Sequence, residues 1–174
     1  MSEDKTIPTV KSDPEDPRLK PWPEGVTWSG KSDPKDPDWR KYRDMMRQRN
    51  KEIAEFTAKR QSELGQYFGI WRDTGPDYFQ CSVAKRNNGR KFCLLAPGDD
   101  GLPGSGKCCT SGGWCNCDWT ILIEGYDDDK KHLWVKGGKK AAQELFQREL
   151  EKKKTAEEEA RKNRPFWKKL LGLN

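Results

Sequence analysis

Residues 77–125 read DYFQCSVAKRNNGRKFCLLAPGDDGLPGSGKCCTSGGWCNCDWTILIEG. This stretch holds all six cysteines, half of the glycines and most of the alternation between apolar and polar residues. The chain on either side is charged, proline-rich or helical in pattern. Short alternating runs separated by turn residues are typical of antiparallel strands. We therefore expect the fold to be organised around a small Cys- and Gly-rich antiparallel sheet of three or four strands.

The clearest hairpin signal lies at the start of this stretch. Apolar and polar residues alternate over 77–84, as in a strand with one buried face. Asn87-Asn88-Gly89 is a turn signal, since Asn and Gly tolerate positive φ. Residues 90–96 then form the predicted return strand, which places Cys81 opposite Cys93. Two further strands are predicted downstream, at 119–124 and 132–135.

The segment 97–118 is rich in glycine and contains four cysteines, so it cannot bury much apolar surface. We expect a cross-link to hold it, and disulfides are the favoured interpretation. Zinc is the second interpretation, although the paired C-x₂₋₄-C knuckles of structural zinc sites are missing and His132 is the only histidine. Free thiols are the third. The candidate disulfide residues are Cys81, Cys93, Cys108, Cys109, Cys115 and Cys117.

Residues 101–107 match G-x-x-x-x-G-K, the phosphate-binding loop of nucleotide-dependent enzymes. In that loop a Ser or Thr follows the lysine and binds Mg²⁺, but Cys108 stands there instead. The glycines that follow do not predict the helix whose N-terminus binds phosphate. We interpret the motif as a surface loop, and we predict no nucleotide cofactor.

Cys108-Cys109 and Gly113-Trp114-Cys115 resemble a short fragment of hevein-type chitin-binding domains. The rest of that family's cysteine framework and its row of aromatic residues are missing from this chain. The resemblance therefore implies neither a fold nor an activity.

Composition limits the size of the core. Hydrophobic residues make up 32% of the 174 residues and charged residues 36%, against usual values of about 45–50% and about 25%. One compact domain with external arms fits these values better than a single well-packed globule. The net charge of +6 permits nucleic-acid binding without requiring it, because 28 acids are interleaved with 34 bases.

Targeting signals are also missing from the sequence. No apolar run is long enough to predict a transmembrane helix. Residues 1–5 carry no apolar region of the kind that begins a secretory signal. We expect an intracellular location or an oxidising organelle compartment, or secretion if the chain is a mature form.

Residues 1–38 contain most of the prolines and are expected to form an extended arm that is ordered by a partner. The arm contains a repeat, since KSDPEDP at 11–17 recurs as KSDPKDP at 31–37. A tryptophan follows each copy. The repeat is interpreted either as two docking points on a partner or as a duplicated linker in which Ser-Asp-Pro begins turns. Trp22 and Trp39 are the candidate docking residues.

The second part of the chain, 39–136, is expected to comprise a helix and the cysteine-stapled core. The helix is predicted over 38–68, with Asp38 as its N-cap. Its basic face over 40–60 is a candidate nucleic-acid surface, although such faces are more often only solvated. The helix carries a stripe of residues three or four apart: Trp39, Tyr42, Met46, Arg49, Ile53, Phe56 and Arg60.

The third part, 137–174, is predicted to be a projecting charged helix over about 139–163 followed by an amphipathic tail. The tail is typical of a segment that docks in a groove or at a membrane interface. Its candidate docking residues are Phe166, Trp167 and Leu170.

These patterns together predict an α+β fold and a non-enzymatic accessory protein whose arms dock on a larger protein assembly. A membrane surface is a further candidate partner through the tail. The alternative function is nucleic-acid binding by the basic helix, and the third is a nucleotide-dependent enzyme. With one histidine, no Ser/His/Asp or Cys/His catalytic set can be assembled, so we predict no enzymatic activity.

Overall fold

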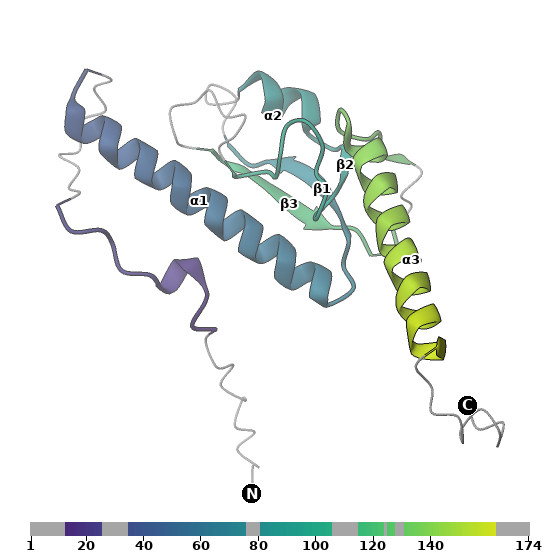
Figure 1. Ribbon diagram of the computed structural model, residues 1–174. Helices are drawn as coiled ribbons and strands as arrows, with labels where there is room; N and C mark the ends of the chain where they lie inside the picture. Colours follow the sequence, from purple (N-terminus) through teal and green to yellow (C-terminus); the bar gives the residue numbers. More distant parts are fainter. Residues whose placement is uncertain are drawn as a thin grey trace, which may run out of the picture.

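The computed structural model describes residues 13–25, 35–75, 81–105, 115–123, 125–127 and 131–162, and it has the predicted α+β fold (Figure 1). Three strands form one antiparallel sheet, and two long helices pack against it. The elements, in chain order, are η1 Pro17–Leu19, α1 Pro37–Glu63, β1 Phe68–Asp73, α2 Ser82–Asn87, β2 Lys91–Cys93, β3 Cys117–Ile121 and α3 Gly138–Lys162.

The sheet has the order β2-β1-β3, so the central strand is the first in the chain. β1 pairs with β2 from Phe68 opposite Cys93, and with β3 from Gly69 opposite Ile121. The segment predicted as a fourth strand contributes a single parallel bridge between Lys91 and Trp134.

One face of the sheet packs against α1 and forms the core. Trp71 of β1 and Phe92 of β2 are fully buried there, with their ring centroids 6.0 Å apart. α1 approaches this face with two small residues, Ala54 and Ala58, which belong to the same buried cluster. Small side chains let the helix backbone lie close to the large aromatic rings, so they limit the voids left in a small core.

Gly69 is required by this aromatic packing. The Phe92 and Trp119 rings meet edge to face across it, with centroids 6.2 Å apart. A Cβ atom at Gly69 would lie 3.1 Å from Trp119 Cδ1 and 3.2 Å from Phe92 Cε1. The absence of a side chain at Gly69 therefore lets a ring from each neighbouring strand come into contact across β1.

The opposite face of the sheet is covered by the start of α3 and by the residues before it. Phe68 contacts Trp134 edge to face at 5.9 Å and Phe146 at the same centroid distance. The Lys91 ammonium lies 4.2 Å from the Phe68 ring centroid, and Lys91 is only 5% exposed. A cation over an aromatic ring is stabilised by the ring's quadrupole, which offsets part of the cost of burying the charge.

The duplicated Asp-Pro motif begins a helix in both copies. Asp16 caps η1 and Asp36 caps α1, and in each case the side chain accepts a backbone N–H bond and a proline occupies the first helical turn. Asp36 is thus the N-cap of α1, two residues before the predicted cap Asp38. These caps are the second Asp-Pro of each copy and not the Ser-Asp-Pro that was predicted to begin a turn, and their physical basis is ordinary N-capping with proline at the first helical position.

The first copy is followed by a segment that runs antiparallel along α1. Asp13 forms an ion pair with Arg60 near the end of α1, at 2.7 Å. Farther along, the Lys20 ammonium lies 3.1 Å from the Glu52 carboxylate. Trp22 stacks on Tyr42 near the start of the helix. The arm was expected to be ordered by another molecule. Residues 13–25 instead contact α1 of the same chain.

Asp100 connects the loop after β2 to the short helix α2 by an ion pair and a hydrogen bond. Its carboxylate forms an ion pair with Arg86 at 2.8 Å and accepts a hydrogen bond from Asn87 Nδ2 at 2.8 Å. Burial opposes ionisation of Asp100, but these two hydrogen bonds outweigh it, and the pKa of Asp100 is lowered.

Two predictions about the sheet were wrong. The hairpin predicted over 77–96 fails because Ser82–Asn87 is a helix, capped by the Cys81 thiol, which accepts the Ala84 N–H at 3.4 Å. The predicted turn at 87–89 does exist, with Gly89 at φ +77°, but it joins a helix to a strand. The central strand β1 was not among the predicted strands, because the helix was predicted to continue to residue 68 and α1 in fact ends at Glu63.

Candidate functional site

The ends of β1 and β3 bring together a group of thiols, which we call the thiol cluster: Cys81, Cys115 and Cys117, with Trp71 and Asp73 beside them. Cys117 lies directly opposite Asp73 in the sheet. Directly opposed residues have Cβ atoms about 5 Å apart, and diagonal neighbours such as Trp71 lie within reach of long side chains. Cys81 reaches the cluster from the N-terminus of α2.

The electrostatics of the thiol cluster distinguish its cysteines from Cys93. A hydrogen bond from Cys115 is the largest influence on Cys117 and lowers its pKa; burial opposes this, and the nearby Trp71 indole N–H lowers the pKa further. Asp73 and Cys81 raise the pKa of Cys117, but the lowering influences are larger, so the pKa of Cys117 is lowered. By contrast, burial raises the pKa of Cys93, which is completely buried at the other end of the sheet.

The disulfide prediction is contradicted for the cysteines that the structure describes. Cys81, Cys93, Cys115 and Cys117 are not disulfide-bonded. Cys81 and Cys93 were predicted to face each other, but the first caps a helix and the second pairs opposite Phe68. The core is stabilised by aromatic packing instead. Cys108 and Cys109 lie outside the described residues.

Metal binding was the second interpretation of the cysteines. In the ranges that the structure describes, no group of three or more His, Cys, Asp or Glu side chains is arranged to hold a metal ion.

Of the two predicted docking tryptophans, Trp22 lies in the arm and Trp39 lies in the first turn of α1. Trp39 is 6% exposed, and its ring stacks on Tyr42. Trp22 is 53% exposed, and one face of its ring is covered by the Arg49 guanidinium at 4.8 Å. Arg49 also donates hydrogen bonds to the backbone carbonyls of Arg18 and Lys20. The predicted helical stripe thus includes the residues that hold the arm.

The basic face of α1 is largely occupied by contacts within the chain. Arg49 and Arg60 hold the arm, as described above. Four of the other six bases between 40 and 60 form ion pairs with nearby acids at 2.9–3.9 Å: Lys41, Arg43, Arg47 and Lys51. Phosphate contacts by these side chains would compete with carboxylates already in place.

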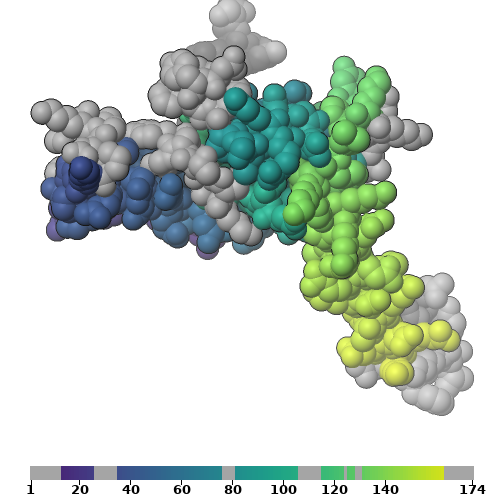
Figure 2. All heavy atoms as spheres, turned by 90° about the horizontal axis from the view of Figure 1, so that it is seen from above, coloured from purple at the N-terminus to yellow at the C-terminus, as the bar shows by residue number. Residues whose placement is uncertain are grey.

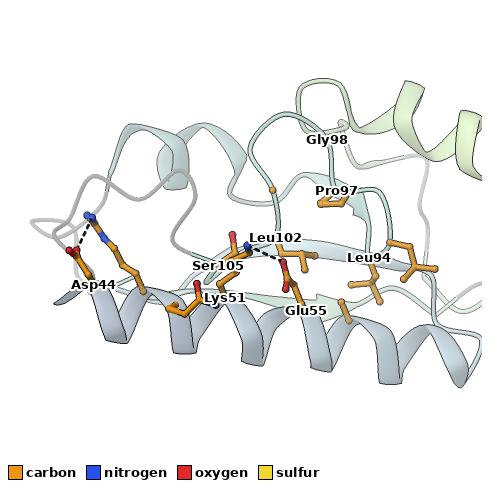
Figure 3. A pocket seen from close by; sticks show the side chains of 13 residues that line it. Asp44, Lys51, Glu55, Leu94, Pro97, Gly98, Leu102 and Ser105 are labelled. Atoms are coloured by element: carbon orange, nitrogen blue, oxygen red, sulfur yellow. Dashed lines mark ion pairs between the residues drawn. The ribbon is translucent and has the colours of Figure 1, made fainter. Parts of the chain in front are cut away.

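A groove of about 910 Å³ lies between α1 and the loop after β2 (Figure 3). The helix contributes a charged wall with two acids and two bases, and the loop contributes an apolar wall. The lining residues are Asp44, Arg47, Gln48, Lys51, Glu55, Ala58, Leu94, Leu95, Pro97, Gly98, Gly101, Leu102 and Ser105. The charged wall is internally paired, so the groove presents no uncompensated charge to a ligand.

The described part of the phosphate-loop motif forms one wall of this groove. Gly101 and Gly104 both have φ +75°, and Leu102 between them belongs to the buried core. A phosphate-binding loop instead turns from a strand directly into a helix N-terminus. Lys107 lies outside the described residues, and the absence of nucleotide binding stays a prediction.

α3 leaves the body of the protein after its first two turns. Ala142 is buried and the Phe146 ring contacts Tyr67 edge to face at 5.8 Å. Every residue from Phe146 to Lys162 is exposed. Figure 2 shows this part of the helix extending away from the other described atoms. Phe146 and Leu150 are one turn apart and are 38% and 48% exposed.

Phe166, Trp167 and Leu170, predicted as docking residues of the tail, lie outside the described residues. Among the helices that the structure describes, none is long and apolar enough to cross a membrane. Comparison of the chain with family models, with curated proteins and with solved structures finds no match.

Two residues of the thiol cluster were not predicted from the sequence. Trp71 and Asp73 lie on β1, and only the register of β1 against β3 brings them to Cys117. If 68–73 had been predicted as a strand, the alternation of side chains between its two faces would have put Trp71 and Asp73 on the same face. The C-x-C spacing of Cys115 and Cys117, which places two sulfurs on one side of the chain, was the signal that the sequence did carry.

Proposed function

We propose that this protein is a non-enzymatic accessory subunit that docks on a larger protein assembly through the projecting part of α3. The observation that carries the proposal is the continuous exposure of the helix from Phe146 to Lys162. At about 1.5 Å per residue, the 25 residues of α3 span about 37 Å. A helical segment that receives no packing from its own chain depends on local pairs or on a partner for its stability.

The chemistry of this segment favours a protein partner. Residues 147–162 contain six bases and five acids, which follow one another along the helix in blocks of opposite sign. Anionic membranes and nucleic acids attract surfaces with a clear excess of bases, and this segment has an excess of only one. The exposed Leu150 supplies an apolar anchor of the kind by which an amphipathic helix binds in a groove, one turn beyond Phe146, whose ring packs on Tyr67 and Phe68.

A matched pair of variants tests the proposal. Leu150→Glu places a charge on the apolar side of the helix, whereas Thr155→Glu adds the same charge on the opposite side. Both residues are exposed, so neither change disturbs the core. The measurement is the size of the complex that contains the tagged full chain in native extract.

The wild type and Thr155→Glu are expected in a complex well above 20.1 kDa, and Leu150→Glu at the size of the single chain. A wild-type chain that behaves as a monomer would contradict the proposal. So would two variants that remain in complexes of the same size.

A further inference from the structure

The thiol cluster contains a buried donor that lacks an acceptor. Trp71 is 0% exposed, and its Nε1 has no hydrogen-bond partner among the described residues. Leaving a buried N–H unpaired costs free energy comparable to a lost hydrogen bond. Cys117 is the diagonal neighbour of Trp71 across the sheet, and ionisation of its thiol would provide a charged acceptor for the indole N–H.

Cys115 lies on the other side of the same sulfur. It is two residues before Cys117, both side chains are partly exposed, and the two thiols are within hydrogen-bonding range. An ionised Cys117 would therefore accept hydrogen bonds from both Cys115 and Trp71. Reactive cysteines are the accessible ones whose surroundings favour the thiolate.

We propose that Cys115 and Cys117 form a redox-active dithiol that exchanges with low-molecular-weight disulfides. Cys117 is the attacking thiol and Cys115 is the resolving thiol. The other groups that face the pair are Asp73 from β1 and Cys81 from the start of α2. The Asp73 carboxylate repels the thiolate, so the contacts from Cys115 and Trp71 must exceed this repulsion.

The exchange proceeds in two steps. The Cys117 thiolate attacks one sulfur of glutathione disulfide, a mixed disulfide forms on Cys117, and one glutathione thiolate leaves and takes up a proton. Cys115 then loses its proton and attacks the Cys117 sulfur, which forms the internal disulfide and releases the second glutathione. Two protein thiols are oxidised and one glutathione disulfide is reduced to two glutathione molecules.

Oxidation of Cys115 and Cys117 to a disulfide would shift the backbone between them, which is hydrogen-bonded to the residue that follows β1. The Asn116 carbonyl between the two cysteines accepts the Thr74 N–H at 3.1 Å and also a bond from the Thr74 hydroxyl. Closing a disulfide over a single intervening residue requires the chain around Asn116 to adjust, because disulfides need a narrow range of Cα separation. We expect the Thr74 amide to exchange faster with solvent in the oxidised protein.

The experiment uses the full reduced chain incubated in glutathione disulfide at pH 7. Chymotryptic cleavage after Trp114 and Trp119 isolates residues 115–119, so Cys115 and Cys117 are read without the other cysteines. The expected product is the internal disulfide, seen as a loss of two hydrogens from this peptide. Cys93 is the internal control and should remain reduced, because its thiol is buried.

Two variants assign the roles. Cys115→Ser should accumulate the glutathione adduct on Cys117, whereas Cys117→Ser should leave Cys115 unmodified over the same time. The iodoacetamide reaction of Cys117 should show a midpoint below the ordinary thiol pKa of about 8.5, and Cys115→Ala should raise that midpoint. The proposal is overturned if the 115–119 peptide stays reduced, if Cys117 pairs with another cysteine, or if both serine variants react equally.

Discussion

Replacing Gly69 by alanine should destabilise the protein, even though the glycine lies inside a strand. In most strands such a change is favourable, because alanine reduces the conformational freedom of the unfolded chain by about 0.4–1 kcal/mol. At Gly69 the new methyl group would meet Trp119 at 3.1 Å and Phe92 at 3.2 Å. Both rings belong to the packed face of the sheet, and Phe92 is 0% exposed.

The sign of the effect follows from comparing the two contributions. Forcing an extra methyl group into a packed core typically costs about 1–3 kcal/mol. The rings cannot move apart freely, since Phe92 also contacts Trp71 and the Trp119 indole donates a hydrogen bond to Gln61 at 2.7 Å. We therefore expect Gly69→Ala to lower the free energy of unfolding by about 1–2 kcal/mol, which lowers Tm by several degrees in a domain of this size.

The assay is urea unfolding of the wild type, Gly69→Ala, Trp119→Leu and the double variant. Leucine at Trp119 removes the ring edge nearest the new methyl group, so Gly69→Ala should cost less in that background. The coupling free energy between the two sites should be at least about 0.5 kcal/mol. A single variant as stable as the wild type, or more stable, would refute the packing argument.

Three further predictions concern the arm, the caps and the loop after β2. Arg49→Met should accelerate amide exchange of residues 17–22 by removing the guanidinium from Trp22, while core stability changes by less than about 0.5 kcal/mol; unchanged exchange would contradict this. Asp36→Ala should cost about 1 kcal/mol in urea unfolding, and Asp16→Ala should leave the core unaffected. Because the pKa of Asp100 is lowered, its contribution is present above about pH 4 and is lost as pH falls through the folded value. Asp100→Asn should therefore be less stable than the wild type at pH 7, and the two should converge at pH 2.

The helices were the most predictable part of this fold. α3 was predicted over about 139–163 and spans Gly138–Lys162, because its charge pairs and flanking glycines are local signals. α1 was predicted over 38–68, but it ends at Glu63 and leaves room for β1. A turn at Leu64 and Gly65, with Gly65 at φ +80°, separates α1 from β1, but the six residues of β1 form too short a run to stand out in the sequence.

The cysteines were less predictable, because their arrangement depends on the register between strands. Cys81 and Val83 match a strand pattern, yet a thiol can also cap a helix, and tertiary contacts selected the helix. Ala54 and Ala58, which lie outside the predicted stripe on α1, are the residues that meet the sheet, since a small core with large rings leaves no space for larger residues on that side.

The most direct test of the docking role is amide hydrogen exchange of α3 in the isolated chain and in its native assembly. Residues 147–162 receive no packing in the described structure, so their amides should exchange with little protection when the chain is alone. In the assembly the same amides should be strongly protected, with the largest change around Leu150. Strong protection of 147–162 in the isolated chain, or exchange that is the same in both states, would contradict the proposal that this part of α3 binds a partner.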